Sequence, residues 1–389
     1  MRSVQCVALS TLLALLAVAP AAADDTHKVV SLEAPDGTAL KASYFAADKP
    51  GPGLLLLHQC NRDRSAWAAF AARAAARGIH VLTLDYRGYG ESGGQRFENY
   101  QEQGPVMQEK WPGDVDAAFA YLASQPGVDK NRIGAAGASC GVNQAVQLAR
   151  RHPGVRTVVL LSGSIQPDAR AYIRSTSSMP VFTAASLDDG NAVQTMRWIK
   201  ELSSHPASRY VEYKAAGHGT DMFAVEKGLE PALLEWFDTH LLQASPTLPA
   251  PAQTAGPKTP ADRFWTALET PGGAAKAREI YDAAKKSEKT MVLFPEGDLN
   301  LFGYQVLQEG RTEDAIIIFK MNADEYPKSA NVYDSLSDAY LAGGHKDEAL
   351  KYAEKAIEML AVDTQATEEF KQQIRESAER KIADLKKKG

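Results

Sequence analysis

Two side chains that can act as nucleophiles stand side by side in the segment GASCG, residues 137–141, where Ser139 and Cys140 lie between two glycines. Residues 132–136 have the pattern of a short strand, and residues 142–151 have the pattern of a helix. A serine in a Gly-x-Ser-x-Gly turn between a strand and a helix is lifted to the tip of a tight turn. The pattern therefore favours Ser139, rather than Cys140, as the nucleophile of an acyl-transfer reaction.

Two further residues have side chains that could activate this serine. Asp189 and His218 each follow a strand-like run later in the chain. Histidine titrates near neutrality and can accept and return a proton, while a carboxylate can orient the imidazole. We expect Ser139, Asp189 and His218 to form a catalytic triad, with the adjacent Asp188 as the alternative acid.

The elements that must position these residues alternate along the first part of the chain. Short apolar runs, expected to be strands, alternate with amphipathic stretches, expected to be helices, which predicts a mostly parallel sheet covered on both faces. The expected strands include residues 53–58, 80–85, 157–162 and 180–185, and the expected helices include residues 65–77 and 115–123.

A proline-rich segment divides the chain. Residues 245–262 hold five prolines and few large apolar residues, which predicts a linker between a domain at 24–244 and a helical domain at 263–389. Because few contacts are expected to cross such a segment, we expect residues 24–244 to fold and act alone.

The helical domain contains a repeat. The same residue types recur 34 positions apart, at Leu307 and Leu341, at Gly310 and Gly344, and at Ala315 and Ala349. This period resembles that of tetratricopeptide repeats over about residues 298–361, and the resemblance implies stacked helix pairs. We expect the helical stretches at 261–289 and 363–387 to complete the stack, and the repeats to bind a protein partner or a second copy.

Residues 27–243 resemble the α/β-hydrolases, and within them the dienelactone hydrolase-like group. The order serine, acid, histidine is that of the fold. LLLLHQC at 54–60 is similar to its third strand and oxyanion loop, and DYRGYGES at 85–92 is similar to the turn after its fourth strand. Dienelactone hydrolases carry cysteine where this chain has Ser139. The resemblance therefore implies a doubly wound, mostly parallel α/β fold and acyl transfer from an ester-like substrate, rather than dienelactone chemistry.

The same resemblance implies an oxyanion hole built from the backbone amides of Cys140 and Cys60, with Gln59 as the fallback for the second donor. If both amides converge on one oxygen atom, the two cysteines lie close enough for a disulfide. A Cys60–Cys140 disulfide is our prediction, and two buried thiols are the alternative.

Residues 92–112 show no clear periodicity, and they are expected to form a loop over Ser139. The aromatic residues of this loop are Phe97, Tyr100 and Trp111. They are candidates for substrate binding, and so is Gln59. A surface excursion without a binding role is the alternative. Only residues 165–178 separate the sixth and seventh expected strands, which leaves no room for a large lid and predicts an open site.

Other polar residues in the domain are expected to be structural. Asp85 and Arg87 are interpreted as a buried charge pair within one turn. His58 and Cys60 are too few ligands for a metal, so we expect neither a metal nor a cofactor.

The first residues predict export. Residues 1–23 combine Arg2, an apolar run at 7–18 and a small-residue site at 21–23, which is typical of a cleaved signal peptide. The apolar run is short for a membrane anchor, so we expect a periplasmic or secreted protein. The formal net charge of −5 over 389 residues gives no basic stripe, which argues against a nucleic-acid partner.

Together these features predict an exported serine hydrolase that cleaves a carboxylic ester or lactone through an acyl-enzyme. A peptidase or an acyltransferase would use the same triad. In the competing class, an inactive hydrolase domain is a scaffold whose repeats bind a protein partner.

Overall fold

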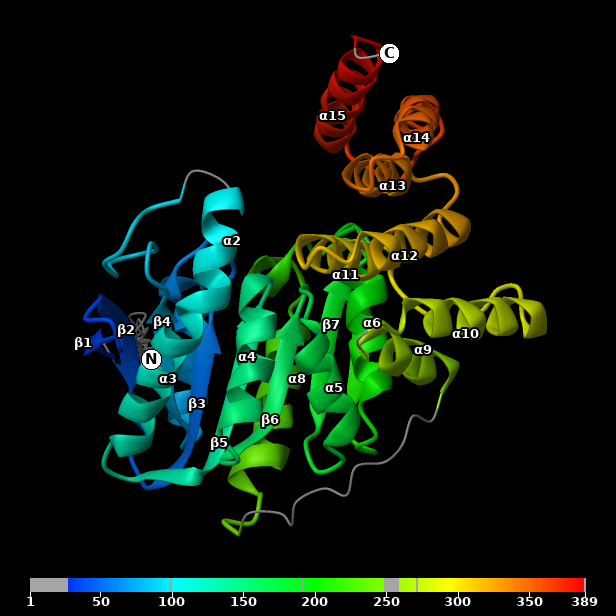
Figure 1. The fold of residues 1–389 in the computed structure, drawn as a ribbon. Helices are drawn as coiled ribbons and strands as arrows, with labels where there is room; N and C mark the ends of the chain where they lie inside the picture. Colours follow the sequence, from blue (N-terminus) through cyan, green and yellow to red (C-terminus); the bar gives the residue numbers. More distant parts are fainter. Residues whose placement is uncertain (1–26, 98–99, 191, 248–258, 271, 388–389) are drawn as a thin grey trace, which may run out of the picture.

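The computed structural model describes residues 27–97, 100–190, 192–247, 259–270 and 272–387. The predicted signal peptide lies outside these residues. Figure 1 shows a sheet layered between helices, with a second group of helices extending from one end of it.

The sheet has eight strands in the order β1-β2-β4-β3-β5-β6-β7-β8. The strand β1 pairs antiparallel with β2, β2 pairs antiparallel with β4, and all other pairs are parallel. The strands are β1 (Lys28–Glu33), β2 (Ala39–Phe45), β3 (Gly51–Leu57), β4 (His80–Asp85), β5 (Val128–Ala138), β6 (Val155–Leu161), β7 (Val181–Ser186) and β8 (Arg209–Tyr213).

Both faces of this sheet are covered, because successive side chains of its buried strands point to opposite sides. Leu55 and Leu57 of β3 belong to one apolar core, and Leu54 and Leu56 belong to another. The first core includes α3 (Trp111–Ser124), α4 (Cys140–Arg151), α5 (Pro167–Ser175) and α6 (Ala192–Leu202), and the second includes α1 (Ala68–Ala76) and α8 (Leu229–Phe237). The predicted doubly wound, mostly parallel sheet followed by a helical domain is confirmed.

The helical domain consists of consecutive helices. They are α9 (Pro260–Leu268), α10 (Ala274–Ser287), α11 (Glu296–Gln308), α12 (Thr312–Glu325), α13 (Ala330–Ala342), α14 (Lys346–Met359) and α15 (Glu368–Lys387). The starts of α11 and α13 lie 34 residues apart, and so do the starts of α12 and α14. The domain begins slightly earlier than predicted, since Thr259 caps α9 within the expected linker.

The helical domain packs closely on the sheet domain. The indole of Trp265 in α9 lies 4.9 Å from that of Trp198 in α6, measured between ring centroids. The buried guanidinium of Arg170 in α5 lies 4.2 Å from the Trp265 ring. Glu269, just after α9, accepts from Arg174 of α5 at 2.9 Å. Aromatic and ionic contacts therefore join the two parts in one core, where the sequence had led us to expect few contacts.

The turn after β4 also differs from its expected form. Asp85 pairs with Arg64, while Arg87 forms ion pairs with Asp114 and Asp36. Asp85 and Arg87 are therefore structural, but they do not pair with each other. Among the described helices, none is both long and apolar enough to cross a membrane.

Candidate active site

Ser139 lies at the sharp turn between β5 and α4. Its backbone adopts φ 51° and ψ −118°, a conformation that side-chain-bearing residues rarely adopt. The flanking glycines make the turn possible, because a side chain at Gly137 would collide with the Gly141 backbone and one at Gly141 would collide with Leu57. The turn therefore holds Ser139 at the carboxyl end of a central strand, where ligands bind in open parallel sheets.

His218 and Asp189 come from the loops after β8 and β7, at the same end of the sheet. His218 Nδ1 lies 2.9 Å from both carboxylate oxygens of Asp189. This hydrogen bond raises the pKa of His218 above its ordinary value, while partial burial opposes the rise. The contact fixes the imidazole with Nδ1–H toward the acid, which leaves Nε2 to accept a proton.

The neighbouring Asp188 has a different role. Its carboxylate accepts from the Ser186 hydroxyl and from the Gly217 amide at 3.2 Å. The Ser186 hydrogen bond, the larger effect, lowers the pKa of Asp188. Asp188 thus ties together the two loops that carry His218 and Asp189, and the structure places Asp189 against the imidazole.

A cavity of about 480 Å³ contains the candidate nucleophile and base. Ser139, Cys140, Cys60 and His218 line it. A further wall comes from α2 (Tyr100–Glu109), with Gly104, Met107 and Gln108. Another part of the wall comes from α11 of the helical domain, with Gly297, Asp298 and Leu301. The expected open site therefore has a wall supplied by the second domain, which no motif in the sequence indicates.

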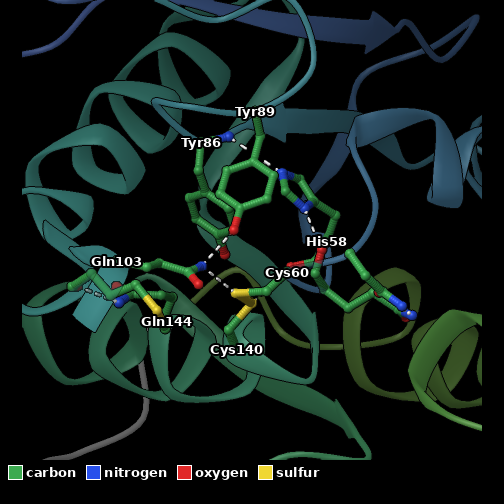
Figure 2. The surroundings of a disulfide bond; sticks show 10 residues. His58, Cys60, Tyr86, Tyr89, Gln103, Cys140 and Gln144 are labelled. Atoms are coloured by element: carbon green, nitrogen blue, oxygen red, sulfur yellow. Dashed lines mark hydrogen bonds between the residues drawn. A yellow bond between two sulfur atoms is a disulfide. The ribbon is translucent and has the colours of Figure 1, made fainter. Parts of the chain in front are cut away.

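Cys60 and Cys140 are joined by a disulfide at this cavity, with Cα atoms 5.9 Å apart. Figure 2 shows the Gln103 side chain beside this bond, where its amide donates to Cys60 Sγ at 2.7 Å and to the Tyr89 hydroxyl. The disulfide joins Cys60, in the loop after β3, to Cys140, the first residue of α4. The Cys140 amide is thus at a helix N-terminus, which favours a negative charge.

Gln59 and Trp111, which we expected to bind substrate, are not among the described residues that line the cavity. Both side chains are buried and have partners inside the protein. Gln59 Oε1 accepts from the amide and the hydroxyl of Thr220, at 2.7 and 2.8 Å. Trp111 is fully buried and stacks on Tyr86 with ring centroids 3.8 Å apart. Both side chains therefore hold the loops around the site.

The predicted loop at 92–112 is largely helical, because α2 and the start of α3 occupy its second half. Phe97 lies near the Tyr89 ring, with centroids 6.2 Å apart, and does not line the described cavity. Tyr100 begins α2, and its side chain lies outside the described part of the chain. The segment does line the cavity that contains Ser139, through Gly104 and its neighbours rather than through its described aromatic residues.

Within the described ranges, no group of three or more His, Cys, Asp or Glu side chains gathers in a way that could hold a metal ion. The arrangement at the cavity is that of a nucleophile, a base with its carboxylate partner, and a helix N-terminus. Such an arrangement can perform acyl transfer.

A family model described as serine aminopeptidase, S33, matches residues 48–298. The thiohydrolase aneE of Aspergillus aculeatus is 30% identical over 184 residues, which cover 47% of this chain and 54% of that protein. An uncharacterized protein of Mycobacterium tuberculosis is 35% identical over 132 residues, or 33% of this chain and 43% of that protein. The chain thus spans about half the length of these curated relatives.

Solved structures with a similar backbone include an esterase of Pyrococcus furiosus, which is 17% identical with a TM-score of 0.45. The similarity covers 55% of this chain and 91% of the esterase. A dienelactone hydrolase-like promiscuous phosphotriesterase from metagenomic libraries has 18% identity and a TM-score of 0.45, covering 56% of this chain and 99% of that one.

Proposed function

Because the chain belongs to the serine aminopeptidase S33 family of α/β hydrolases, we propose that it is a serine hydrolase that cleaves an ester-like substrate through an acyl-enzyme. One observation carries this proposal. Ser139, on its strained turn, shares a cavity with His218, whose Nδ1 is held 2.9 Å from Asp189.

The proposed reaction has two halves. In the first half, Ser139 Oγ bonds to the substrate carbonyl carbon while His218 Nε2 takes the serine proton. The resulting imidazolium then gives this proton to the leaving group. Asp189 stabilises that imidazolium and keeps its orientation. Water then attacks the acyl-enzyme by the same route, which releases the acid and restores Ser139.

The negative charge that develops on the carbonyl oxygen needs donors. We assign the Cys140 amide, at the N-terminus of α4, and the Cys60 amide, which the disulfide holds nearby. Each preorganised donor of this kind typically contributes about a hundredfold or more in rate.

Export to the periplasm or the medium is part of the proposal. Its support is the Cys60–Cys140 disulfide, since such bonds persist in oxidising compartments and are rare in the cytosol. We also propose that the 34-residue helix pairs are tetratricopeptide-like. In this proposal a protein partner or a second copy binds to α13 to α15, because these helices do not line the cavity.

The test combines covalent labelling with turnover of the purified mature protein. A fluorophosphonate should label Ser139, and a panel of esters and amides with graded acyl length should identify the substrate class. Ser139→Ala should abolish labelling and lower turnover by about a millionfold. Ser164→Ala, which removes another hydroxyl from the same cavity, is the matched control and should retain both. An unlabelled wild-type protein would instead indicate a scaffold.

A further inference from the structure

The wall that α11 contributes to the cavity carries a charge. Asp298 is a lining residue and is only 4% exposed, and its Oδ2 has no hydrogen-bond partner among the described residues. Burial raises the pKa of Asp298 to about 6, and the nearby charge of Arg170 opposes this rise. Above that pH, the cavity therefore contains a carboxylate held in a water-poor wall.

No lysine or arginine in the described part of the chain lines the cavity to balance this carboxylate. The remaining lining is neutral apart from His218. It consists of amides, hydroxyls, the disulfide and small or apolar side chains, such as those of Gln108, Asn143, Thr195 and Leu301.

The cation whose charge acts on Asp298 is Arg170, which is not among the described residues that line the cavity. Arg170 Nη1 donates to the carbonyl of Ile165 at 2.8 Å, and the guanidinium lies 4.2 Å from the Trp265 ring. Its Nε also faces Glu269 at 3.5 Å. Arg170 is 1% exposed and is not among the described residues that line the cavity, so it is not placed to form a direct ion pair with a substrate there.

We propose that Asp298, supplied by the helical domain, makes this site select uncharged or cationic substrates and reject acyl groups that carry a carboxylate. The proposal rests on the proposed serine hydrolase. An anionic acyl chain would lose its water and face Asp298 in a cavity that no lysine or arginine of the described residues lines, and like charges in a water-poor site repel strongly. A neutral chain meets amides and hydroxyls, and an ammonium group meets the unpaired carboxylate oxygen.

Three p-nitrophenyl alkylphosphonates of equal chain length, ending in methyl, ammonium or carboxylate, test this selection. In each, Ser139 Oγ bonds to phosphorus, nitrophenolate leaves, and His218 takes the serine proton. The rate of Ser139 labelling by each probe is measured by intact mass at pH 8. This measurement does not require the natural substrate to be known. In the wild type, we expect the carboxylate probe to react at least about tenfold more slowly than the methyl probe. The ammonium probe should react at least as fast as the methyl probe.

Asp298→Asn keeps the shape of the side chain and should bring the carboxylate and methyl rates within about threefold. Glu309→Gln is the matched control, because it removes an exposed acid at the end of the same helix and should keep the wild-type ratio. If Asp298→Asn fails to fold, Leu301→Lys, at a half-buried lining position, adds a cation to the same wall and should also narrow the difference.

Equal rates for all three probes in the wild type would overturn the inference, and so would a full difference that persists in Asp298→Asn. Both outcomes leave Ser139 labelled and the proposed hydrolase intact. Failure of every probe to label Ser139 would instead refute the serine mechanism on which the inference depends.

Discussion

The backbone of Ser139 is held in a conformation that is costly for a residue with a side chain. Such strain typically costs about 1–3 kcal/mol and persists only where the surroundings impose it. Here Gly137 and Gly141 allow close backbone contact, and the Ser139 amide donates to Leu161 O at 2.9 Å. This strained backbone conformation places the Ser139 hydroxyl at the cavity, where a nucleophile must lie to reach a substrate.

The partner of His218 sets the pH dependence of activity. Only neutral His218 can accept the serine proton, so kcat/KM should fall as the pH drops through the pKa of His218. Asp189 raises that pKa, which places the acid limb above the ordinary histidine value. Asp189→Asn removes the raising interaction, so the limb should move to lower pH, while kcat falls by about 10⁴-fold because the tautomer is lost. A pH profile of kcat/KM for both proteins measures the shift.

Asp188→Asn is the control for this experiment. Asp188 contacts Ser186 and Gly217 but not the imidazole, so its variant should keep the wild-type acid limb. A downward shift in Asp188→Asn, with none in Asp189→Asn, would show that the acid is misassigned.

Several site residues could be predicted from the sequence because their chemistry depends on local patterns. The elbow glycines and the positions of Asp189 and His218 after strands are visible in one dimension. Gln59 and Trp111 were assigned wrongly to substrate binding, because the internal partners of a polar or aromatic side chain are set by tertiary packing. Asp298 was missed because nothing near it in the chain connects it to Ser139.

At the scale of elements, the disulfide connects the two segments assigned to the oxyanion hole. Closing the 80-residue loop should stabilise the fold by about 4 kcal/mol in the chain-entropy model. Reduction should therefore lower both the melting temperature and kcat, because the Cys60 loop is released from α4. Calorimetry and ester turnover, with and without a reductant, measure the two effects.

The Cys60→Ser/Cys140→Ser double variant is the matched control. It should resemble the reduced wild type, and a reductant should not change it further. Full activity in the double variant would show that the bond is not needed to hold the oxyanion donors.

Helix α2 shows why element prediction failed between β4 and α3. The segment shows no clear periodicity, so the sequence favoured a loop, and it contains Gly104 and Pro105, which disfavour helix interiors. In the structure, tertiary contacts replace the missing propensity: Gln144 of α4 donates to the Met107 carbonyl at 3.1 Å. The strands β3, β4, β6 and β7 were predictable because their apolar runs are buried almost throughout and need no such support.

The interface between α5 and α9 should be sensitive to its buried cation. Removing one partner of a buried ion pair typically costs about 3–5 kcal/mol, because the other charge is left uncompensated. Arg170→Ala should therefore lower the free energy of unfolding by up to that amount, since the buried carboxylate of Glu269 would keep only Arg174 as a partner. Urea denaturation followed by tryptophan fluorescence measures it.

Arg150→Ala provides the comparison. Arg150 pairs with Asp168 at 3.1 Å on the surface, where both side chains are 48% exposed, so its loss should cost at most about 1 kcal/mol. Equal effects of the two substitutions would show that Arg170 does not hold the helical domain in place.

At the scale of the whole molecule, the helical domain supplies part of the wall of the cavity that contains Ser139. Figure 1 shows α9 beside α6 and α11 across the end of the sheet that carries Ser139, while α13 to α15 extend away. The change of periodicity along the chain predicted an α/β part followed by a helical part, but composition carries no information on whether the second part folds back on the first. That depends on contacts such as the one between Trp198 and Trp265, which are distant in sequence.

A chain ending at Ser245 should therefore behave differently from a free domain. It retains Ser139, Asp189 and His218, but it loses the α11 wall and exposes the Trp198 surface that α9 covers. We expect lower soluble yield, a lower melting temperature and reduced kcat/KM. A chain ending at Ala361 is the control, because it removes only the last helix and keeps the wall, so it should retain wild-type kcat/KM. If the shorter chain were as stable and as active as the full protein, α11 would have no part in the site.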